Sequence, residues 1–538
     1  MVARTAARTH VLSEERAMTG RPLSFADASL NADRRTIELA QLASRTDPVD
    51  VLVIGGGVTG AGAALDAAAR GLSVVLVEAH DLAFGTSRWS SKLVHGGLRY
   101  LATGNISIAR ESALERHRVM TVIAPHLVRP VGQLLPVYSD TPFVAKIAAR
   151  AGMLAGDVLR HNAKTPATVL PRSRRISAQR AGELCPGIRT DGLRSAVLGH
   201  DGQLIDDARL VVALARTAAG LGAGICTYTR ASDVTGHGAV LTDTRTGHSF
   251  PIAARSVINA TGVWSGQVDD SIRLRPSRGT HLVVDAAAVG NPTAALTVPM
   301  AGSISRFVFA LPQQLGRVYI GLTDEDAPGD IPDEPTPSKN EIDLLLNAIN
   351  QALSRELTRS DIRGTYSGLR PLIDDGGTGE RATADLSRNH LVRVSPTGVI
   401  TVVGGKLTTY RQMAQDAVDE AVQRGGIRAA SCETGSLALV GAVGRSGDST
   451  LPESLVARFG AEAGRVLETA TVSNPAGPIA EGIDITRAEV QYALTAEGAL
   501  TVDDILARRT RIALVPSDAD AARPAVTEIV KATVSASA

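Results

Sequence analysis

Cysteine is scarce in this sequence, with three residues among 538. Cys185, Cys226 and Cys432 lie far apart and are odd in number, so they match neither a disulfide framework nor the spacing of metal ligands. The eleven histidines form no HExxH or HxH cluster either. We therefore expect no bound metal, structural roles for the cysteines, and a reducing compartment, because disulfides persist mainly in oxidising ones.

The sequence also lacks an excess of charge and any long apolar run. A formal net charge of +1 excludes a chain-wide basic surface for nucleic acid. No stretch of 18 or more residues is apolar throughout, so a transmembrane helix is not expected and membrane contact would be peripheral. Residues 1–47 contain no apolar core of a secretory signal. We expect them to form a mobile extension with one short helix near Arg34–Ser44.

A strand–turn–helix unit follows this extension. Val49–Ile54 is an apolar, largely β-branched run that predicts a buried parallel strand. Gly55, Gly57 and Gly60 then form GxGxxG, before a helix-forming run and a second apolar strand that ends at Glu78. The glycines suit a tight turn, a close approach of pyrophosphate, and packing of the helix on the strand, while the acid suits ribose hydroxyls. The unit predicts a dinucleotide fold, although the motif alone does not separate NAD from FAD.

Two later segments predict further strands of the same sheet. Arg255–Gly262 and Gly398–Lys406 each read as a strand that ends in a glycine turn, on the side where open α/β sheets bind ligands. We therefore expect one α/β nucleotide-binding domain assembled from residues 48–269 and 363–428.

The pattern between and after these segments is different. The runs RFVFAL and RVYIGLT predict a β-hairpin, and Ser338-x-x-Glu341 is a capping box before an amphipathic helix. We expect residues 270–362 to form an antiparallel substrate-binding domain. Residues 429–538 contain two more capping boxes, at Thr486 and Thr501, and predict a helical C-terminal domain.

The order of the motifs resembles that of FAD-dependent glycerol-3-phosphate dehydrogenases. The resemblance covers about Val49–Val422, extends more loosely through the C-terminal domain, and rests on IGGGVTGAGAALDAAARGL, GTSRWSSKLVHGGLRYL, ERHRVMTVIAPHL, IDDARL, NATGVW, SRGTHLVV, IGLTDED, YSGLRPL and GGKLTTYR. It implies a glutathione-reductase-like FAD domain, an antiparallel substrate domain and a helical C-terminal domain. It also implies oxidation of sn-glycerol 3-phosphate to dihydroxyacetone phosphate by hydride transfer to FAD, with electrons passed to a membrane quinone.

The resemblance implies which residues contact FAD. Those for the adenosine diphosphate half are Gly55, Gly57, Gly60 and Glu78. Those along the pyrophosphate, ribityl chain and flavin are Thr86, Ser87, Lys92, His95 and Gly97. Those that close over the cofactor from other segments are Thr261, Gly262, Gly404, Gly405, Lys406, Leu407 and Thr408.

One pair departs from the family pattern. Arg88 and Trp89 stand where family members commonly carry a small Ser/Ala pair. If the loop still follows FAD, this pair should point outward, and the departure weakens the placement of Ser87 more than that of Lys92.

The substrate carries a phosphate dianion, which requires cations with several donors. The resemblance implies Arg99, Tyr100, Arg370, Arg388 and Lys406 as substrate contacts, with Arg370 and Lys406 nearest the reacting centre. Arg99 and Arg388 could instead form structural ion pairs, and Tyr100 could be an aromatic wall.

Oxidation of a secondary alcohol also needs a base for the hydroxyl proton, and a neutral imidazole suits that role. His281 is the first candidate, so His281, Arg370 and Lys406 form the expected catalytic group. His95 is the second candidate, although its HGG context favours contact with FAD. A purely structural role remains the alternative for either histidine.

Residues 143–180 are the segment best suited to a membrane surface. They contain eight Lys or Arg residues against one Asp. One helical face carries Phe143, Ile147, Ala151, Leu154 and Val158, with Lys146 and Arg150 beside it. This pattern fits a peripheral helix on anionic lipid at the cytoplasmic face of the cell membrane, or a basic face of a helix in solvent.

Two rival functions stay open. A glycerol-3-phosphate oxidase would pass electrons to oxygen, and a catalytically inert protein would bind FAD only. We expect no nucleic-acid partner. A homodimer is one possible assembly, since the sequence does not fix the oligomeric state.

Overall fold

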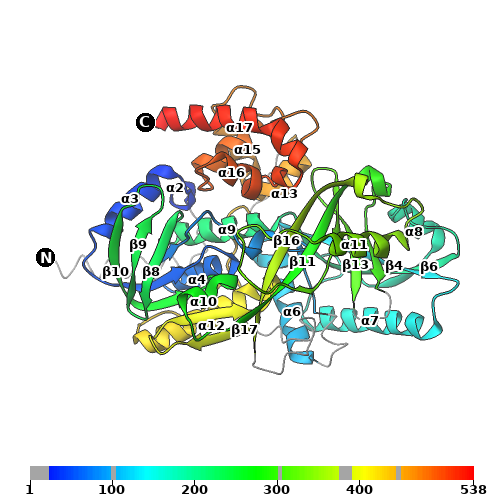
Figure 1. Ribbon diagram of the computed structural model, residues 1–538, viewed down its shortest axis with the longest axis horizontal. Coiled ribbons are helices and arrows are strands. Elements are labelled where there is room, and N and C mark those ends of the chain that lie inside the picture. Colours follow the sequence, from blue (N-terminus) through cyan, green and yellow to red (C-terminus); the bar gives the residue numbers. More distant parts are fainter. Residues whose placement is uncertain (1–23, 98–104, 301–305, 375–389, 444–449, 538) are drawn as a thin grey trace.

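The computed structural model describes residues 24–97, 105–300, 306–374, 390–443 and 450–537. Two large β-sheets account for most of the strands, and a group of helices formed by the C-terminal part of the chain packs against both halves of the molecule (Figure 1).

The first sheet has eight strands and a parallel centre. Its main path is β17 (His390–Val394), β18 (Ile400–Gly404), β10 (Ser249–Asn259), β1 (Val49–Ile54), β2 (Val74–Val77) and β7 (Gly224–Cys226). The hairpin of β8 (Thr229–Thr235) and β9 (Gly238–Asp243) pairs antiparallel with the first half of β10. The strands predicted from Val49–Ile54, Arg255–Gly262 and Gly398–Lys406 are neighbours in this sheet, as expected.

Helices cover one face of the first sheet. On β1, Val51 and Val53 join the core formed with α4 (Val58–Ala69), α9 (Asp207–Gly220) and α12 (Tyr410–Gly425). The alternate side chains of the same strand, Leu52 and Ile54, join a second core on the other face, with α3 (Ala32–Ala43) and the β8–β9 hairpin. Because both faces are buried, β1 is apolar throughout, apart from Asp50.

The N-terminal segment, expected to be a mobile extension, contains two helices that contact the rest of the molecule. Residues from 24 onward contain α2 (Phe25–Ala28) and α3 (Ala32–Ala43), of which α3 is the helix expected near Arg34–Ser44. The guanidinium of Arg35 is buried against Asp243 and the carbonyl oxygen of Thr227, and the backbone of Leu30 bonds to the C-terminal domain. Buried arginines inside a surface helix carry no periodic signal, which is why the sequence did not predict this docking. Residues 1–23 of the extension lie outside the described residues.

The second sheet has ten strands and is largely antiparallel. Its strands are β3 (Leu93–Val94), β4 (Val128–Tyr138), β5 (Arg174–Ser177), β6 (Leu193–Leu204), β11 (Leu274–Asp285), β12 (Ala295–Pro299), β13 (Phe307–Pro312), β14 (Arg317–Gly321), β15 (Glu325–Asp326) and β16 (Ile362–Ile373). The predicted hairpin is β13–β14, and the capping box at Ser338 opens α11 (Lys339–Asn350). One face of the sheet packs on α8 (Ala178–Leu184) and α11.

The two sheets divide the chain differently from the expected domains. Strands β3 to β6 fall within residues 48–269, and all of β16 after Ile362 falls within residues 363–428, yet all of them pair in the second sheet rather than the first. The substrate-side sheet is therefore larger than residues 270–362. The sequence did not indicate the larger sheet, because β4 and β16 pair with strands that lie tens to hundreds of residues away. A single sequence does not show which distant strands pair, or in which register.

The C-terminal domain is helical, as predicted for residues 429–538. Its helices are α13 (Glu453–Phe459), α14 (Ala463–Glu468), α15 (Arg487–Thr495), α16 (Val502–Asp504) and α17 (Pro516–Ser537). The capping boxes at Thr486 and Thr501 are both formed. The fold is therefore the predicted α/β architecture with a second, antiparallel sheet and a helical C-terminal domain.

Two helices lie below the second sheet in Figure 1, α6 (Ile106–Arg118) and α7 (Phe143–Asn162). Helix α7 runs along the lower edge of the view, whereas α17 runs along the upper edge. Within the described ranges, no helix combines the length and the apolar character that crossing a membrane requires.

Candidate functional site

A cavity of about 1400 Å³ lies where the two sheets meet. The first sheet contributes the carboxyl ends of β1, β2, β10 and β18, and the second sheet contributes residues of β11 and β16. The volume exceeds the few hundred to 1000 Å³ typical of a site for one drug-sized ligand. It is large enough for a dinucleotide together with a small substrate.

The glycines of the fingerprint shape one end of the cavity. Gly55 has φ +109°, and a Cβ atom there would lie 2.6 Å from the carbonyl oxygen of Ala260, so only glycine fits this turn. Gly57 lines the cavity at the N-terminus of α4, where the N–H of Val58 donates to Ser87 Oγ at 2.9 Å. Gly60 lies beneath the lining, where a Cβ atom would collide with the Gly55 carbonyl oxygen. Its part is to let helix α4 pack on β1.

Glu78 lies at the end of β2 and lines the same end. Its carboxylate accepts hydrogen bonds from the backbone N–H groups of Gly56 at 2.6 Å and His80 at 2.9 Å. Burial raises the pKa of Glu78, while these two hydrogen bonds oppose that rise. The side chain is thus fixed at the place where a ribose would lie against the fingerprint.

The segment Thr86–Gly97 forms a wall of the cavity, but not every predicted residue faces inward. Thr86, Ser87, His95 and Gly97 line the cavity. Thr86 Oγ1 donates to the Leu369 carbonyl oxygen at 2.7 Å, and this bond ties the segment to β16.

Lys92 does not line the cavity, which corrects its predicted position along FAD. The side chain is buried, and its Nζ donates to Asp207 Oδ2 at 2.8 Å and to the Arg88 carbonyl oxygen at 2.9 Å. Burial lowers the pKa of Lys92 to about 8, although Asp207 opposes this shift. A lysine in a motif of small residues resembles a ligand contact in sequence, and only the fold reveals its carboxylate partner.

The pair Arg88–Trp89 does not point outward, contrary to expectation. Arg88 is fully buried, with its guanidinium 4.2 Å from the Trp89 ring and 5.2 Å from the Phe84 ring. Trp89 lines the cavity and stacks on Tyr366, with ring centroids 5.8 Å apart. The pair therefore turns inward, between the cavity wall and the C-terminal domain.

The predicted closing segments all reach the cavity. Thr261 and Gly262 follow β10, and residues 404–408 follow β18 at its carboxyl end. Thr408 Oγ1 accepts the backbone N–H of His95 at 3.0 Å, and His95 Nδ1 lies 3.3 Å from Asp201. Lys406 Nζ donates to Ser112 Oγ at 2.9 Å.

His281 lies at the end of the cavity that the second sheet forms. Its Nε2 lies 2.9 Å from Ser91 Oγ, and its ring stacks on Tyr366 with centroids 4.6 Å apart. Burial and the nearby charges of Lys92 and Arg370 lower the pKa of His281 well below 6.5. The imidazole is therefore neutral at physiological pH, as a proton acceptor requires.

Arg370 lines the cavity near His281. Its guanidinium donates to Ser277 Oγ, the Thr323 carbonyl oxygen and Asp324 Oδ1, at 3.2, 3.2 and 3.3 Å. These contacts fix a forked donor beside the cavity. The other predicted substrate contacts, Arg99, Tyr100 and Arg388, lie outside the described residues.

Several lining residues were not predicted. Ser90 and Ser91 lie in the same motif as Thr86 and Ser87, and their hydroxyls could have marked them. His80 and Phe84 also line the cavity, near Glu78, and their rings stack with centroids 3.9 Å apart. Nothing in the sequence distinguishes these two from ordinary loop residues.

The residues present fit FAD. One end of the cavity has the features that bind a dinucleotide: the tight turn at Gly55, the N-terminus of α4 and the fixed carboxylate of Glu78. Along the rest of the cavity, the small-residue turns after β10 and β18 leave backbone groups accessible to a cofactor. In the described part of the chain, no group of three or more His, Cys, Asp or Glu side chains is arranged to hold a metal ion.

Comparison with known protein families gives two matches. Residues 50–411 match the FAD dependent oxidoreductase family, and residues 395–538 match the C-terminal domain of alpha-glycerophosphate oxidase. Together the two matches span nearly all of the described chain.

Individual proteins are also similar. Glycerol-3-phosphate dehydrogenase 1 of Mycobacterium tuberculosis (strain ATCC 25618 / H37Rv) is 60% identical over 497 residues, which are 91% of this chain and 96% of the relative. The mitochondrial glycerol-3-phosphate dehydrogenase of Bos taurus is 34% identical over 90% of this chain and 70% of its own length. The glycerol-3-phosphate dehydrogenase of Bacillus halodurans, solved in complex with FAD, is 26% identical with a TM-score of 0.69, covering 93% of this chain and 94% of that one.

One ion pair at the edge of the site gives a pH-dependent prediction. His390 Nε2 and Asp416 Oδ2 lie 2.7 Å apart beside residues 404–408. The hydrogen bond to Asp416 raises the pKa of His390 against the effect of burial. The pair therefore stabilises the fold fully below about pH 6.5, the unfolded value, and loses this contribution as the pH rises through the raised folded pKa.

We expect His390→Gln to lower the free energy of unfolding, and with it the melting temperature, more at pH 6 than at pH 8.5. The difference in free energy should be about 1 kcal/mol or less, because the pair is partly exposed. Thermal melts of both proteins at the two pH values measure this difference. His237→Gln, at an exposed histidine, is the control and should show no such trend. An equal loss for His390→Gln at both pH values would contradict the assignment.

Proposed function

The chain belongs to the family of FAD-dependent glycerol-3-phosphate dehydrogenases, and we propose that it oxidises sn-glycerol 3-phosphate to dihydroxyacetone phosphate and passes the electrons to a membrane quinone. The observation that carries this proposal is the single cavity that joins the dinucleotide fingerprint to His281, Arg370 and Lys406. Relatives at 60% identity bear the name of this dehydrogenase.

When bound, FAD supplies the acceptor of the hydride that leaves the substrate carbon. The protein has to remove the hydroxyl proton at the same time. His281 Nε2 lies 2.9 Å from Ser91 Oγ at the cavity, and burial keeps the imidazole in the neutral form that a base requires. We assign His281 as the base and Ser91 as the residue that orients its ring. His95, whose Nδ1 is engaged by Asp201, is assigned to the FAD side of the cavity.

The phosphate dianion needs cations that are already held in place. Arg370 offers a guanidinium fixed by Ser277 and Asp324, and Lys406 approaches from the loop after β18. Both line the same cavity as His281. We assign Arg370 and Lys406 to the substrate, and keep Arg99, Tyr100 and Arg388 as further contacts proposed from the sequence.

Helix α7 supports a lipid-borne acceptor. One side of α7 lines the cavity through Gly152, Met153 and Gly156. Its outer side exposes Phe143 at 75% and Leu154 at 56%. Since one helix separates the cavity from an apolar and basic surface, a quinone held in a bilayer would come close to the cofactor cavity. We infer a peripheral position on the cytoplasmic face of the membrane.

Two other functions predict different behaviour. The match of residues 395–538 to a glycerophosphate oxidase domain favours oxygen as an alternative acceptor. A catalytically inert FAD protein is disfavoured by the neutral His281 beside Arg370 in the cavity.

The first prediction from the proposed function concerns the reaction itself. Glycerol 3-phosphate added without oxygen should bleach the flavin absorbance, and a water-soluble quinone should restore it with turnover. A dehydrogenase should produce little peroxide in air, whereas an oxidase should produce one peroxide per substrate. Glycerol serves as the control substrate because it lacks the phosphate. A flavin that stays oxidised with glycerol 3-phosphate would contradict the proposal.

The second prediction concerns the base. His281→Gln should lower kcat by about 10²- to 10⁴-fold, the usual range for general base catalysis, and should leave FAD bound. Stopped-flow measurement of flavin reduction reports this step directly. His126→Gln is the matched control, because His126 is another largely buried histidine with a lowered pKa, of about 4, and does not line the cavity. Similar losses in both variants would indicate a structural role for His281.

The third prediction concerns α7. Replacing Phe143, Ile147 and Leu154 with serine should reduce co-sedimentation with vesicles of phosphatidylglycerol and phosphatidylcholine by about tenfold or more, since about 0.8 kcal/mol is lost per buried CH₂ group. Ile37→Ser with Val534→Ser is the control, because these side chains are equally exposed elsewhere. Unchanged binding of the α7 variant would assign its basic, apolar face to solvent or to another protein.

A further inference from the structure

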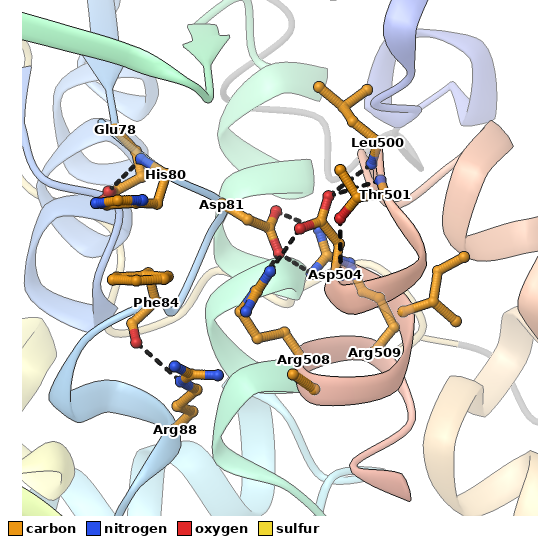
Figure 2. A network of polar contacts seen from close by, with 12 residues as sticks. Glu78, His80, Asp81, Phe84, Arg88, Leu500, Thr501, Asp504, Arg508 and Arg509 are labelled. Atoms are coloured by element: carbon orange, nitrogen blue, oxygen red, sulfur yellow. Dashed lines mark hydrogen bonds and ion pairs between the residues drawn. The ribbon is translucent and has the colours of Figure 1, made fainter. Parts of the chain in front are cut away.

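The segment Glu78–Lys92 has two sides with different partners. Glu78, His80 and Phe84 line the cavity. Asp81, between them, is fully buried and points the other way, into the helical C-terminal domain (Figure 2). In this segment, residues that line the cavity and a residue that contacts the C-terminal domain therefore lie within a few positions of each other.

Two consecutive arginines of the C-terminal domain bind Asp81. Arg509 donates from Nη1 to Oδ2 and from Nη2 to Oδ1, both at 2.8 Å, and Arg508 Nε donates to Oδ2 at 2.6 Å. Although burial alone would raise the pKa of Asp81, Arg509 and Arg508 lower it below its usual value. The carboxylate therefore stays charged, and the forked pair fixes both its position and its orientation.

A second contact reaches the same segment from the other side. Asp504 accepts from Arg508 Nη2 at 2.5 Å and from the Tyr228 hydroxyl at 2.6 Å (Figure 2 shows the arginine contact). The backbone N–H of Tyr228 in turn donates to the His80 carbonyl oxygen at 2.7 Å. The C-terminal domain thus contacts two segments next to Glu78, the bend between β7 and β8 that contains Tyr228 and the turn that contains Asp81.

A third contact explains the pair Arg88–Trp89. Arg511 Nη2 donates to the Arg88 carbonyl oxygen at 2.5 Å, and its guanidinium lies 5.2 Å from the Trp89 ring. Arg511 Nε also lies 3.1 Å from Asp206, next to the Asp207 that binds Lys92. The bulky pair therefore contacts the C-terminal domain, where a pair of small residues would leave this space unfilled.

We propose that the C-terminal domain is a positioning element of the FAD site, and that Arg508, Arg509 and Arg511 hold the segment Glu78–Lys92 in the shape that retains the cofactor. Each of the five cations here has a carboxylate partner, so the arginines supply fixed geometry to the segment. The cations are Arg88, Lys92, Arg508, Arg509 and Arg511, and their partners are Asp81, Asp206, Asp207, Glu334 and Asp504. This inference concerns the cofactor alone and does not depend on which alcohol is oxidised.

The test compares two buried arginines that cross the same domain boundary. Arg509→Lys keeps the charge and removes the fork to Asp81. Arg216→Lys is the matched control, because Arg216 is 2% exposed like Arg509 and also forms a forked interdomain pair, with Glu462 at 2.6 and 2.9 Å. Helix α9, which carries Arg216, does not belong to the segment Glu78–Lys92.

Retention is measured on the holoenzyme, by the rise in flavin fluorescence after dilution, together with the melting temperature in excess FAD. We expect Arg509→Lys to weaken FAD binding at least tenfold, equivalent to about 1.4 kcal/mol, and Arg216→Lys to change it less than threefold. Hydrogen–deuterium exchange should be faster over residues 78–92 in Arg509→Lys alone. Equal retention in the two variants, or losses that merely follow the fall in melting temperature, would overturn the proposal.

A milder variant keeps the test decisive if Arg509→Lys does not fold. Asp504→Asn weakens the contacts to Arg508 and Tyr228, while Asp503→Asn changes an exposed neighbour in the same helix. The same FAD and exchange measurements apply, and only Asp504→Asn should release FAD faster. No substrate is present in these experiments, so their failure is distinguishable from an error in the proposed reaction.

Discussion

Buried ion pairs between distant segments are the constraint on which the site depends. Asp81 with Arg509, Lys92 with Asp207, and Arg116 with Asp201 are each largely buried, and each joins segments that are far apart in sequence. Such pairs add little net stability over apolar packing, yet removing one partner leaves a buried charge at a cost of about 3–5 kcal/mol. Their value here is geometric, because each charge has only one position in which it is satisfied.

The same constraint reaches the proposed base. Asp207 Oδ2 accepts the backbone N–H and the hydroxyl of Ser90 as well as Lys92 Nζ. Ser91, the next residue, then has its hydroxyl beside His281 Nε2, and the Tyr366 hydroxyl donates to the Ser90 carbonyl oxygen. A buried carboxylate thus sets the position of a hydroxyl that touches the imidazole. The low pKa of His281 follows from the same burial and from the cations gathered there.

Local signals predicted what is contiguous in sequence. The strand, glycine turn, helix and acid from β1 to Glu78 form one unit, and their predicted order and bounds hold within a few residues. The strand patterns at Arg255–Gly262 and Gly398–Lys406 also predicted the turns after β10 and β18, which line the cavity. The capping boxes were equally reliable because each is a local pair of hydrogen bonds.

Long-range pairing was not predictable from one sequence. Lys92 and Arg88 were misplaced because their partners, Asp207 and the C-terminal domain, lie over a hundred residues away. The predicted division of strands between the two sheets was wrong for the same reason, because β4 pairs with β6 and β12, which lie far from it in sequence. A polar residue in a motif of small residues gives the same sequence signal whether it faces a ligand or a buried carboxylate. Its role is known only when its partner in the folded chain is known.

The fold places the two roles that we propose around the cavity, retention of FAD and transfer of electrons to the acceptor, on different sides of the molecule. The C-terminal helices lie along the upper edge of Figure 1 and contact the segment that begins at Glu78, whereas α7 lies along the lower edge and contributes to the cavity lining. We propose that retention of FAD depends on the wall that the buried forked ion pairs hold in place. We also propose that electrons reach a lipid-borne acceptor past α7, where the small residues Gly152 and Gly156 line the cavity. The two proposed roles therefore belong to different elements of the fold.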